Sequence, residues 1–390
     1  MPVYMRGGRM VYRPRSGIVH KHSALPTWVQ SMSAGNVKEL LNTKLTDVAY
    51  SSHGGTVVGS AADIVTEWGT FAHDSTTSKL YAFGGGHVNY NGNESYVFDA
   101  RQDSPTWAVF SSPTATLPAT NTNDAYGDGK PAASHQFNLN HVDPIRGRMY
   151  LLGIGSRFDN GSNGASVFGL DLSNQTWTQY TSIPGASANT QGAAAAWDSN
   201  RQKFWIKQFN TNQIRRYDPA TDTYESFGDG ELQVQYASLA YDPVRDCLLS
   251  CGGFNALGTQ DGGATQITVW DCSTASGGSI TSTASINATG LPAEAVWGLQ
   301  YYPPSGDFVA YRYGNTCYRI APTGSITGAN WTATAVTMNG DTAPNSTNMR
   351  GGIFGKWRYD TYLGVFLWCG GASGSPNNTV TNMFAYKPDF

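Results

Sequence analysis

The sequence is poor in the features that mark helical, membrane-spanning and secreted proteins. Only 14% of its 390 residues are charged, and no long stretch rich in Ala, Glu, Lys and Leu predicts a major helix. No apolar run approaches the ~18 residues that a membrane helix needs, so we expect no membrane insertion. The first residues lack the uninterrupted apolar segment of a secretory signal, so we expect the chain to fold in the cytoplasm without a signal peptide.

Cysteine is also scarce. The five cysteines are Cys247, Cys251, Cys272, Cys317 and Cys369, an odd number without a Cys-x-x-Cys motif. This pattern excludes a disulfide framework and a zinc knuckle and favours small buried thiols. The glycine-rich segments lack the Gly-Lys-Ser/Thr of a phosphate loop, and the Asp-Gly turns lack the spacing of a calcium loop. The sequence therefore implies no metal and no cofactor.

Glycine and aromatic residues are abundant. The chain contains 45 Gly, 21 Tyr, 16 Phe and 11 Trp, and 40% of its residues are hydrophobic. This composition is typical of many short strands joined by turns, with enough apolar surface for a large core. We expect one folded, strand-rich protein.

A strand–turn–strand pattern recurs along the chain. Each copy has an aromatic or apolar strand, a turn with Asp or Pro, and a second apolar strand, at residues 71–86, 139–155, 193–209, 238–253, 299–314 and 354–371. Most copies continue into a third and a fourth strand, whereas the last copy ends after its third. The repetition predicts an all-β fold, a β-propeller of six four-stranded blades. We expect residues 26–31, which share a Thr-Trp pair with the first two units, to supply the missing strand and close the propeller, which would span residues 26–390.

The N-terminal residues form a basic arm ahead of this repeat. Six Lys or Arg and no acidic residue lie between Met1 and Lys38, while the whole chain carries 25 basic and 28 acidic residues. A basic segment on an acidic body is typical of docking to a partner. We expect residues 1–25 to attach the propeller to a larger protein assembly rather than to nucleic acid; the alternative is a solvated, frayed end.

The chain resembles kelch repeats in its glycines and aromatics. Glycine pairs close the second strand at Gly85-Gly86, Gly252-Gly253 and Gly370-Gly371, and an aromatic residue follows in each of these units. The segments GGGHVNYNGNESYVFD (84–99) and PAASHQFN (131–138) are similar to those of bacterial and phage kelch-type proteins. They also resemble, more distantly, ulvan-type propeller polysaccharide lyases, although those have seven blades and are secreted.

The lyase resemblance implies a set of catalytic roles. Elimination beside a uronate carboxylate needs a base, an acid for the leaving oxygen and a group that neutralises the carboxylate. His87 and His135 match the lyase histidines in kind, and Tyr126 and Arg157 are the candidates for the acid and the neutralising group. The alternative is structural, because the turn after a glycine pair needs side chains that satisfy free backbone groups; Asn91, Asn93 and Glu94 have this character.

Aromatic and cationic side chains near the unit entrances are candidates for ligand binding. They are Tyr90, Trp68, Tyr236, Trp297 and Arg350. Aromatic faces stack on sugar rings, but the same residues also pack between blades, and we expect packing for at least half of the aromatics.

Two functional hypotheses follow. The first is a non-enzymatic, virion-associated propeller of the phage tail, spike or receptor-binding type, which docks by its arm and recognises surface glycans. It would be located in the virion, or outside the cell after release. The second is a polysaccharide lyase or depolymerase that acts by β-elimination on uronic-acid-containing polysaccharide.

Overall fold

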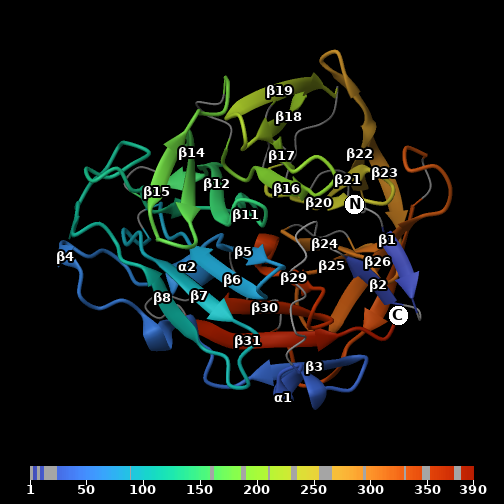
Figure 1. Ribbon diagram of the computed structural model, residues 1–390, viewed down its shortest axis with the longest axis horizontal. Coiled ribbons are helices and arrows are strands. Elements are labelled where there is room, and N and C mark those ends of the chain that lie inside the picture. Colours follow the sequence, from blue (N-terminus) through green and yellow to red (C-terminus); the bar gives the residue numbers. More distant parts are fainter. Residues whose placement is uncertain are drawn as a thin grey trace.

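The chain is all-β, and its sheets are arranged around a common centre in the manner of a propeller (Figure 1). In the described part of this computed structural model, four sheets contain four or more strands. The described residues are 3–6, 9–12, 24–87, 89–158, 162–185, 190–209, 211–229, 235–253, 266–292, 296–328, 331–344, 352–372 and 379–390.

Antiparallel strands follow one another in runs of four. The first run is β5 (Thr70–Asp74), β6 (Lys79–Phe83), β7 (Ser95–Asp99) and β8 (Trp107–Ser111). The second is β11 (Asn140–Asp143), β12 (Arg148–Ile154), β14 (Gly164–Asp171) and β15 (Trp177–Tyr180). The third is β16 (Ala194–Asp198), β17 (Lys203–Lys207), β18 (Gln213–Asp218) and β19 (Thr223–Gly228).

Two further runs extend the third into a larger sheet. The fourth run is β20 (Ser238–Asp242), β21 (Cys247–Cys251), β22 (Gln266–Ser276) and β23 (Ser279–Thr289). The fifth is β24 (Gly298–Tyr302), β25 (Asp307–Tyr311), β26 (Thr316–Pro322) and β27 (Trp331–Thr337). Short parallel contacts from β19 to β23 and from β23 to β27 join these three runs into a sheet of 12 strands.

The last sheet combines the two ends of the described ring. Its strands are β29 (Arg358–Asp360), β30 (Val365–Ala372), β31 (Thr379–Lys387), β3 (Asn36–Leu40) and, at the edge, β28 (Asn339–Gly340). β3 pairs antiparallel with β31, with Val37 opposite Tyr386. An N-terminal strand thus lies beside the C-terminal strand.

The prediction that residues 26–31 form this strand is wrong. Thr27–Gln30 is a helical turn, α1, in which the Pro26 carbonyl accepts hydrogen bonds from Val29 N at 3.0 Å and Gln30 N at 3.1 Å. Trp28 is buried, with 6% exposure, in the core between the last and first sheets. The Thr-Trp pair thus opens a strand at Trp107 and at Trp177 but a helical turn at Trp28.

Short elements complete the described chain. They are β1 (Val3–Arg6) and β2 (Arg9–Tyr12), which form a hairpin; η1 (Leu45–Val48); α2 (Asp63–Thr66); η4 (Phe354–Lys356); and the two-residue pairs β4 (Gly54–Gly55) with β9 (Thr116–Leu117) and β10 (Ser134–His135) with β13 (Ser156–Arg157). None of the helices described is long and apolar enough to cross a membrane. Of the N-terminal arm, only β1, β2 and residues 24 and 25 lie within the described residues, so its docking role stays a prediction.

Aspartate side chains shape the turns between the first two strands of several runs. Asp198 Oδ1 accepts hydrogen bonds from the backbone N of Asn200 at 3.0 Å and of Arg201 at 2.9 Å. Asp143 and Asp242 hold their turns in the same way. An aspartate that mimics a backbone acceptor is a common way to fix a turn, and this explains why Asp recurs at this place in the sequence.

The hydrophobic core is divided among clusters that lie between consecutive runs. Tyr81 and Leu151 belong to a cluster between the first and second runs, and Trp205 and Leu248 to one between the third and fourth. Phe71 and Leu367 share a cluster, so the last sheet also packs on the first run. Because burial of a large apolar side chain contributes roughly 1.5–3 kcal/mol, these interfaces hold the sheets in fixed positions around the centre.

Candidate functional site

The first strand of each run lies nearest the centre of the ring (Figure 1). We call β5, β11, β16, β20, β24 and β29 the inner strands. Their two ends define two ends of the ring: the entry end, where the inner strands begin, and the turn end, where they meet the aspartate turns. The described residues among those predicted from sequence fall at or near the entry end.

A residue with positive φ precedes every inner strand by a few positions. These residues are Trp68 (φ 49), Phe137 (φ 50), Gly192 (φ 70), Tyr236 (φ 67), Val296 (φ 60) and Phe354 (φ 46). Bulky residues rarely adopt this conformation, and backbone hydrogen bonds hold several of them to a neighbouring unit. Phe137 N donates to Trp68 O at 2.8 Å, and Tyr236 N donates to Gly192 O at 2.9 Å.

His87 and His135 come together at the entry end. Their ring centroids are 5.5 Å apart and perpendicular, and the His135 ring also lies 4.9 Å from that of Trp68. His87 is exposed and Trp68 half-buried, whereas His135 is only 2% exposed. Asn89 lies within 3.2 Å of His135 Nε2. The two predicted histidines therefore form one aromatic cluster with Trp68.

The backbone explains why His87 projects here. Gly86 has a φ of 62, and a side chain there would collide with the backbone of Ser134. The glycine thus permits β10 to approach the loop closely, and His87 N donates to Arg157 O at 3.0 Å. In the β10–β13 pairing, His135 lies opposite Ser156. Close backbone approach at a glycine therefore brings the two histidine segments into contact.

Tyr126 and Arg157 have side-chain partners of their own. Tyr126 is 4% exposed, and its hydroxyl donates to Asn91 O at 2.8 Å. Arg157 Nε lies 3.4 Å from Asp124 Oδ1, and its other nitrogens donate to backbone carbonyls. The structure thus brings the two predicted histidines together, but it directs the side chains of Tyr126 and Arg157 to structural contacts.

Tyr90 belongs to a buried network centred on Glu94. Its hydroxyl donates to Glu94 Oε1 at 2.5 Å, and Tyr96 donates to the same oxygen at 2.8 Å. His53 Nε2 lies 3.3 Å from Glu94 Oε2. Tyr90 is 1% exposed, and burial raises the pKa of its phenol strongly. The tyrosine therefore holds the loop rather than facing a ligand.

Asn91 and Asn93 satisfy backbone groups of neighbouring loops. Asn91 Nδ2 donates to Thr56 O at 2.7 Å, and Asn93 Nδ2 donates to Pro131 O at 2.9 Å. Both amides are fully buried. The Gly-Asn-Glu segment thus anchors the surrounding loops, which accounts for its residue types.

The remaining predicted ligand residues differ in accessibility. Tyr236 is half-buried at the entry end, where its ring lies 5.3 Å from that of Phe137 and its hydroxyl accepts a hydrogen bond from Gln191 at 3.0 Å. Trp297 is 2% exposed and packs edge-on against Tyr318 at 5.5 Å. Its indole is buried between sheets and does not contribute to the surface. Arg350 lies outside the described residues.

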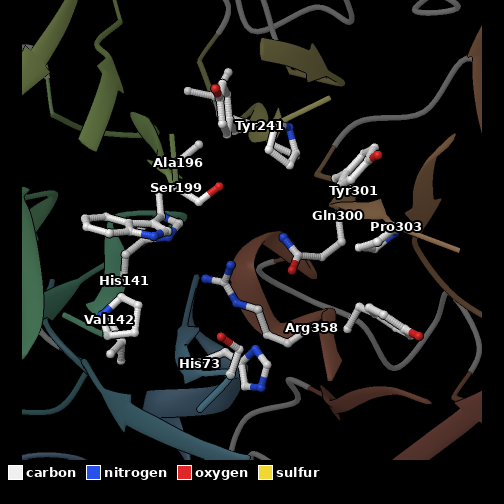
Figure 2. A pocket seen from close by; sticks show the side chains of 17 residues that line it. His73, His141, Val142, Ala196, Ser199, Tyr241, Gln300, Tyr301, Pro303 and Arg358 are labelled. Atoms are coloured by element: carbon white, nitrogen blue, oxygen red, sulfur yellow. The ribbon is translucent and has the colours of Figure 1, made fainter. Parts of the chain in front are cut away.

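The turn end has a hollow that the sequence motifs did not indicate. Residues from every inner strand line a cavity there of about 240 Å³, and Arg358 projects into it (Figure 2). The available signal was a charged residue inside the otherwise aromatic segment Trp357-Arg358-Tyr359. No cluster of metal-ligating side chains is found in the described part of the chain, and the five cysteines are free and buried.

Comparisons with known proteins agree with the fold. No protein-family model matches the chain, and no curated protein sequence does. A solved propeller-type protein, "Structure of YjhT", matches with a TM-score of 0.50 and 12% sequence identity, over 86% of this chain and 97% of that chain. At this identity the similarity shows the fold alone. The chain is thus an all-β protein with a propeller-like arrangement of sheets.

Proposed function

We propose that the protein is a six-bladed kelch-type propeller that recognises glycans as a non-enzymatic, virion-associated module. The five runs of four strands and the last sheet support this blade count, with β3 as the fourth strand of the sixth blade. The glycine pairs after β6, β21 and within β30 support the kelch assignment.

The accessible aromatic surface at the entry end carries the glycan proposal. Trp68 and Tyr236 are half-buried and His87 is exposed. The rings of His135 and Phe137 connect them, because His135 contacts His87 and Trp68, and Phe137 contacts His135 and Tyr236. Gln191 and Asn89, both half-buried, supply amide groups at the same end. Flat aromatic faces with adjacent amides suit a sugar, whose ring stacks while its hydroxyls form hydrogen bonds.

A glycan array followed by calorimetry on the best ligand tests the proposal. Trp68→Ala should weaken binding by about tenfold, because an aromatic stacking contact contributes up to ~1.5 kcal/mol. Trp68→Phe should retain most of the affinity. Tyr224→Ala, which removes a half-buried ring on the outer strand β19, is the matched control and should bind like the wild type. Absence of any glycan ligand, or equal loss in the control, contradicts the proposal.

Docking through residues 1–25 is the second part of the proposal. The basic composition of this segment supports it. A chain lacking residues 1–22 should melt at the same temperature as the full chain but should no longer copurify with phage particles. If particle association survives the deletion, the segment is not the docking element.

The second candidate function is a polysaccharide lyase, which the contact between His87 and His135 favours. One histidine could remove the proton beside a uronate carboxylate. Tyr126 and Arg157 would have to leave their present partners to act as acid and neutralising group. Incubation with a panel of acidic polysaccharides tests this function through the ultraviolet absorbance of unsaturated uronates. A signal that disappears in His135→Asn supports a lyase; no signal across the panel excludes it for those substrates.

A further inference from the structure

The cavity at the turn end is built by equivalent positions of the inner strands. The third residue from the end of β11, β24 and β29 is polar: His141, Gln300 and Arg358. The same position in β16 and β20 is Ala196 and Ala240, whose small side chains leave space. All five residues line the cavity. The cavity is thus lined by polar side chains on three inner strands, and the small alanine side chains on two others leave its space unfilled.

Arg358 is held rigidly with part of its guanidinium directed into the cavity. Its residue exposure is 5%, Nε donates to Phe71 O at 2.8 Å, and Nη2 donates to Asn140 O at 3.1 Å. Nη1 has no hydrogen-bond acceptor within the described residues. Figure 2 shows the guanidinium extending toward the middle of the hollow, facing Gln300. Two backbone contacts therefore fix the plane of the group while N–H donors remain for a ligand.

The positive charge of Arg358 has no compensating carboxylate in the cavity. Of the described residues that line the hollow, none is Asp or Glu, and Arg358 is the only Lys or Arg. The nearby Asp360 carboxylate is bound by His73 Nε2 at 2.9 Å. Burial, followed by the charge of Arg358, lowers the pKa of His141 to about 3, so this imidazole is neutral at neutral pH. Burial lowers the pKa of Arg358 to about 9, which still leaves it charged at neutral pH.

The walls of the cavity suit the body of a small organic molecule. Trp197, Tyr241 and Tyr301 contribute aromatic surface, and the exposed residues Ser75 and Ser199 lie at the mouth, so the hollow opens to solvent. The volume exceeds by many times the space that one water molecule needs. A buried cation without an acidic partner is stabilised when an anion supplies the missing charge.

We propose that this cavity binds a small carboxylic acid, whose carboxylate pairs with the guanidinium of Arg358. A single carboxylate matches the single positive charge, and its planar pair of oxygens matches the planar donors of arginine. The amide of Gln300 and the aromatic walls contact the remainder of the ligand. This site lies at the opposite end of the inner strands from Trp68 and His87, and it does not depend on glycan binding there.

Calorimetry with D-glucuronate and acetate as probes tests the site. D-glucose serves as the uncharged analogue of glucuronate, and inorganic phosphate as the competing anion. We expect glucuronate to bind at least about tenfold more tightly than glucose. Arg358→Gln should weaken glucuronate binding by at least about tenfold, whereas Arg319→Gln, which removes a partly exposed arginine paired with Asp307, should have no effect.

Arg358 also forms hydrogen bonds from β29 to β5 and β11, so Arg358→Gln could weaken binding by disturbing the fold. A second variant separates these two effects. Ser199→Trp fills the mouth of the cavity and leaves Arg358 and its backbone contacts unchanged. It should abolish glucuronate binding, and Trp68→Ala at the entry end should preserve it. Absence of carboxylate binding, binding of phosphate alone, or full binding by Ser199→Trp overturns the proposal.

Discussion

Two buried cations, Lys356 and Arg358, lie at the junction between the last sheet and the first. Lys356 is 1% exposed, and its Nζ donates to Val65 O at 2.8 Å. Two residues further on, Arg358 is bound to carbonyls of β5 and β11. Long charged side chains thus cross from the last unit to the first, where apolar side chains would leave backbone carbonyls unsatisfied.

Lys356 should make stability depend on pH in the alkaline range. Burial lowers its pKa from 10.5 to about 8. Between these values the unfolded chain binds more protons than the folded chain, so the cost of burying the charge is relieved as the pH rises. From pH 7.5 to pH 10, the stability of the wild type relative to Lys356→Met should increase by about 2 kcal/mol.

Chemical denaturation of the two proteins at several pH values measures this difference. Tyrosines and cysteines of the unfolded chain also titrate in this range, but both proteins contain the same ones. Their effect cancels in the comparison except for that of Cys369, whose thiol interacts electrostatically with Lys356. A wild-type advantage that is constant or falls with pH would contradict a buried, charged Lys356.

For single residues, the sequence predicted which residue types lie at the entry end better than it predicted their burial and their hydrogen-bond partners. His87 and His135 were predicted because they match the histidines of the lyases in kind, and the structure places their rings 5.5 Å apart. Arg157 pairs with Asp124, which is 33 residues away and outside any local motif. Glu94 lies in the same motif as Tyr90, but the motif does not show that their side chains meet in a buried network. Arg358 was not predicted from the sequence. It stands out only because no Asp or Glu is among the described residues that line the cavity, and a local sequence motif does not show this.

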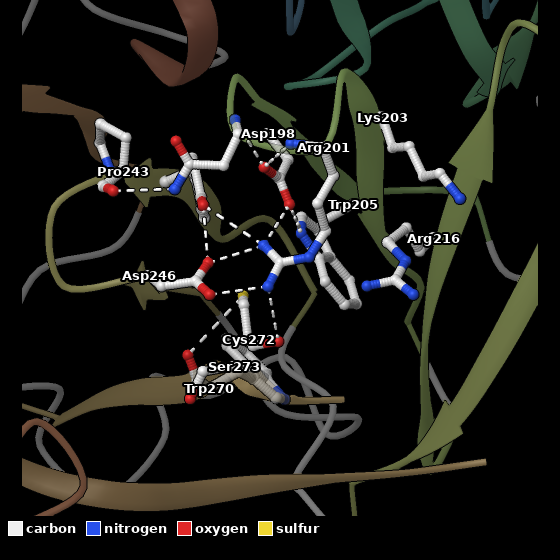
Figure 3. A network of polar contacts seen from close by, with 12 residues as sticks. Asp198, Arg201, Lys203, Trp205, Arg216, Pro243, Asp246, Trp270, Cys272 and Ser273 are labelled. Carbon is white, nitrogen blue, oxygen red and sulfur yellow. Dashed lines mark hydrogen bonds and ion pairs between the residues drawn. The ribbon is translucent and has the colours of Figure 1, made fainter. Parts of the chain in front are cut away.

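The turns of neighbouring units are linked by a polar network. Arg201, at the turn between β16 and β17, contacts both Asp198 at 3.0 Å and Asp246 of the next unit at 2.7 Å (Figure 3). It also donates to the backbone carbonyl of Cys272 at 3.1 Å. One guanidinium therefore joins three elements of two consecutive runs.

Arg201→Met should lower the free energy of unfolding by about 2 kcal/mol at neutral pH, since it removes hydrogen bonds to charged groups. The hydrogen bond from Arg201 lowers the pKa of Asp246 below 3.8. This stabilisation is present above pH 3.8 and is lost as the pH falls through the lower folded value, so wild type and mutant should converge in acid.

Denaturant unfolding from pH 7 to pH 3 measures this convergence. Lys79→Met is the control, because Lys79 pairs at 3.9 Å with Asp99, and the two side chains are 37% and 30% exposed; such a pair contributes up to ~1 kcal/mol. An effect of Arg201→Met no larger than the control would show that the network does not stabilise the ring.

Strands were the elements most accessible to prediction. Each recurring strand pair in the sequence corresponds to an inner strand and its neighbour, from β5 and β6 to β29 and β30. Their alternation and their Asp turns act within a few residues, so local pattern is sufficient. The strand predicted at residues 26–31 is instead a helical turn, from which Trp28 packs into the core. Tertiary packing, rather than the local pattern, determined the conformation of this segment.

The pairing of β3 with β31 fixes the arrangement of the whole molecule. Val37 and Leu40 of β3 are 3% and 5% exposed and pack in the clusters on either side of the last sheet. The last repeat ends after its third strand, and this predicted that an N-terminal strand closes the last sheet. The sequence did not predict where this strand lies, because long-range pairing is determined by packing on both faces of the sheet rather than by a local signal.

Removal of β3 should destabilise the last sheet far more than removal of the arm. We expect a chain that starts at residue 45, which lacks β3 and also α1 with its buried Trp28, to lose at least about 5 kcal/mol of unfolding free energy relative to one that starts at residue 24. Several buried side chains contribute roughly 1.5–3 kcal/mol each. Amides of β30 and β31 should lose their protection first, which hydrogen exchange measures. Equal protection in both chains would show that β3 does not stabilise the ring.

The same pairing has a consequence for synthesis. β3 leaves the ribosome more than 300 residues before its partner β31. Its apolar side chains therefore stay exposed, and its backbone groups stay unpaired, during most of translation. A nascent chain can complete its first runs of strands in order, but β3 stays unpaired until β28 and β31 have been synthesised. The ring should therefore become resistant to proteases in a single late step, and a chaperone that protects residues 36–40 would act throughout that interval.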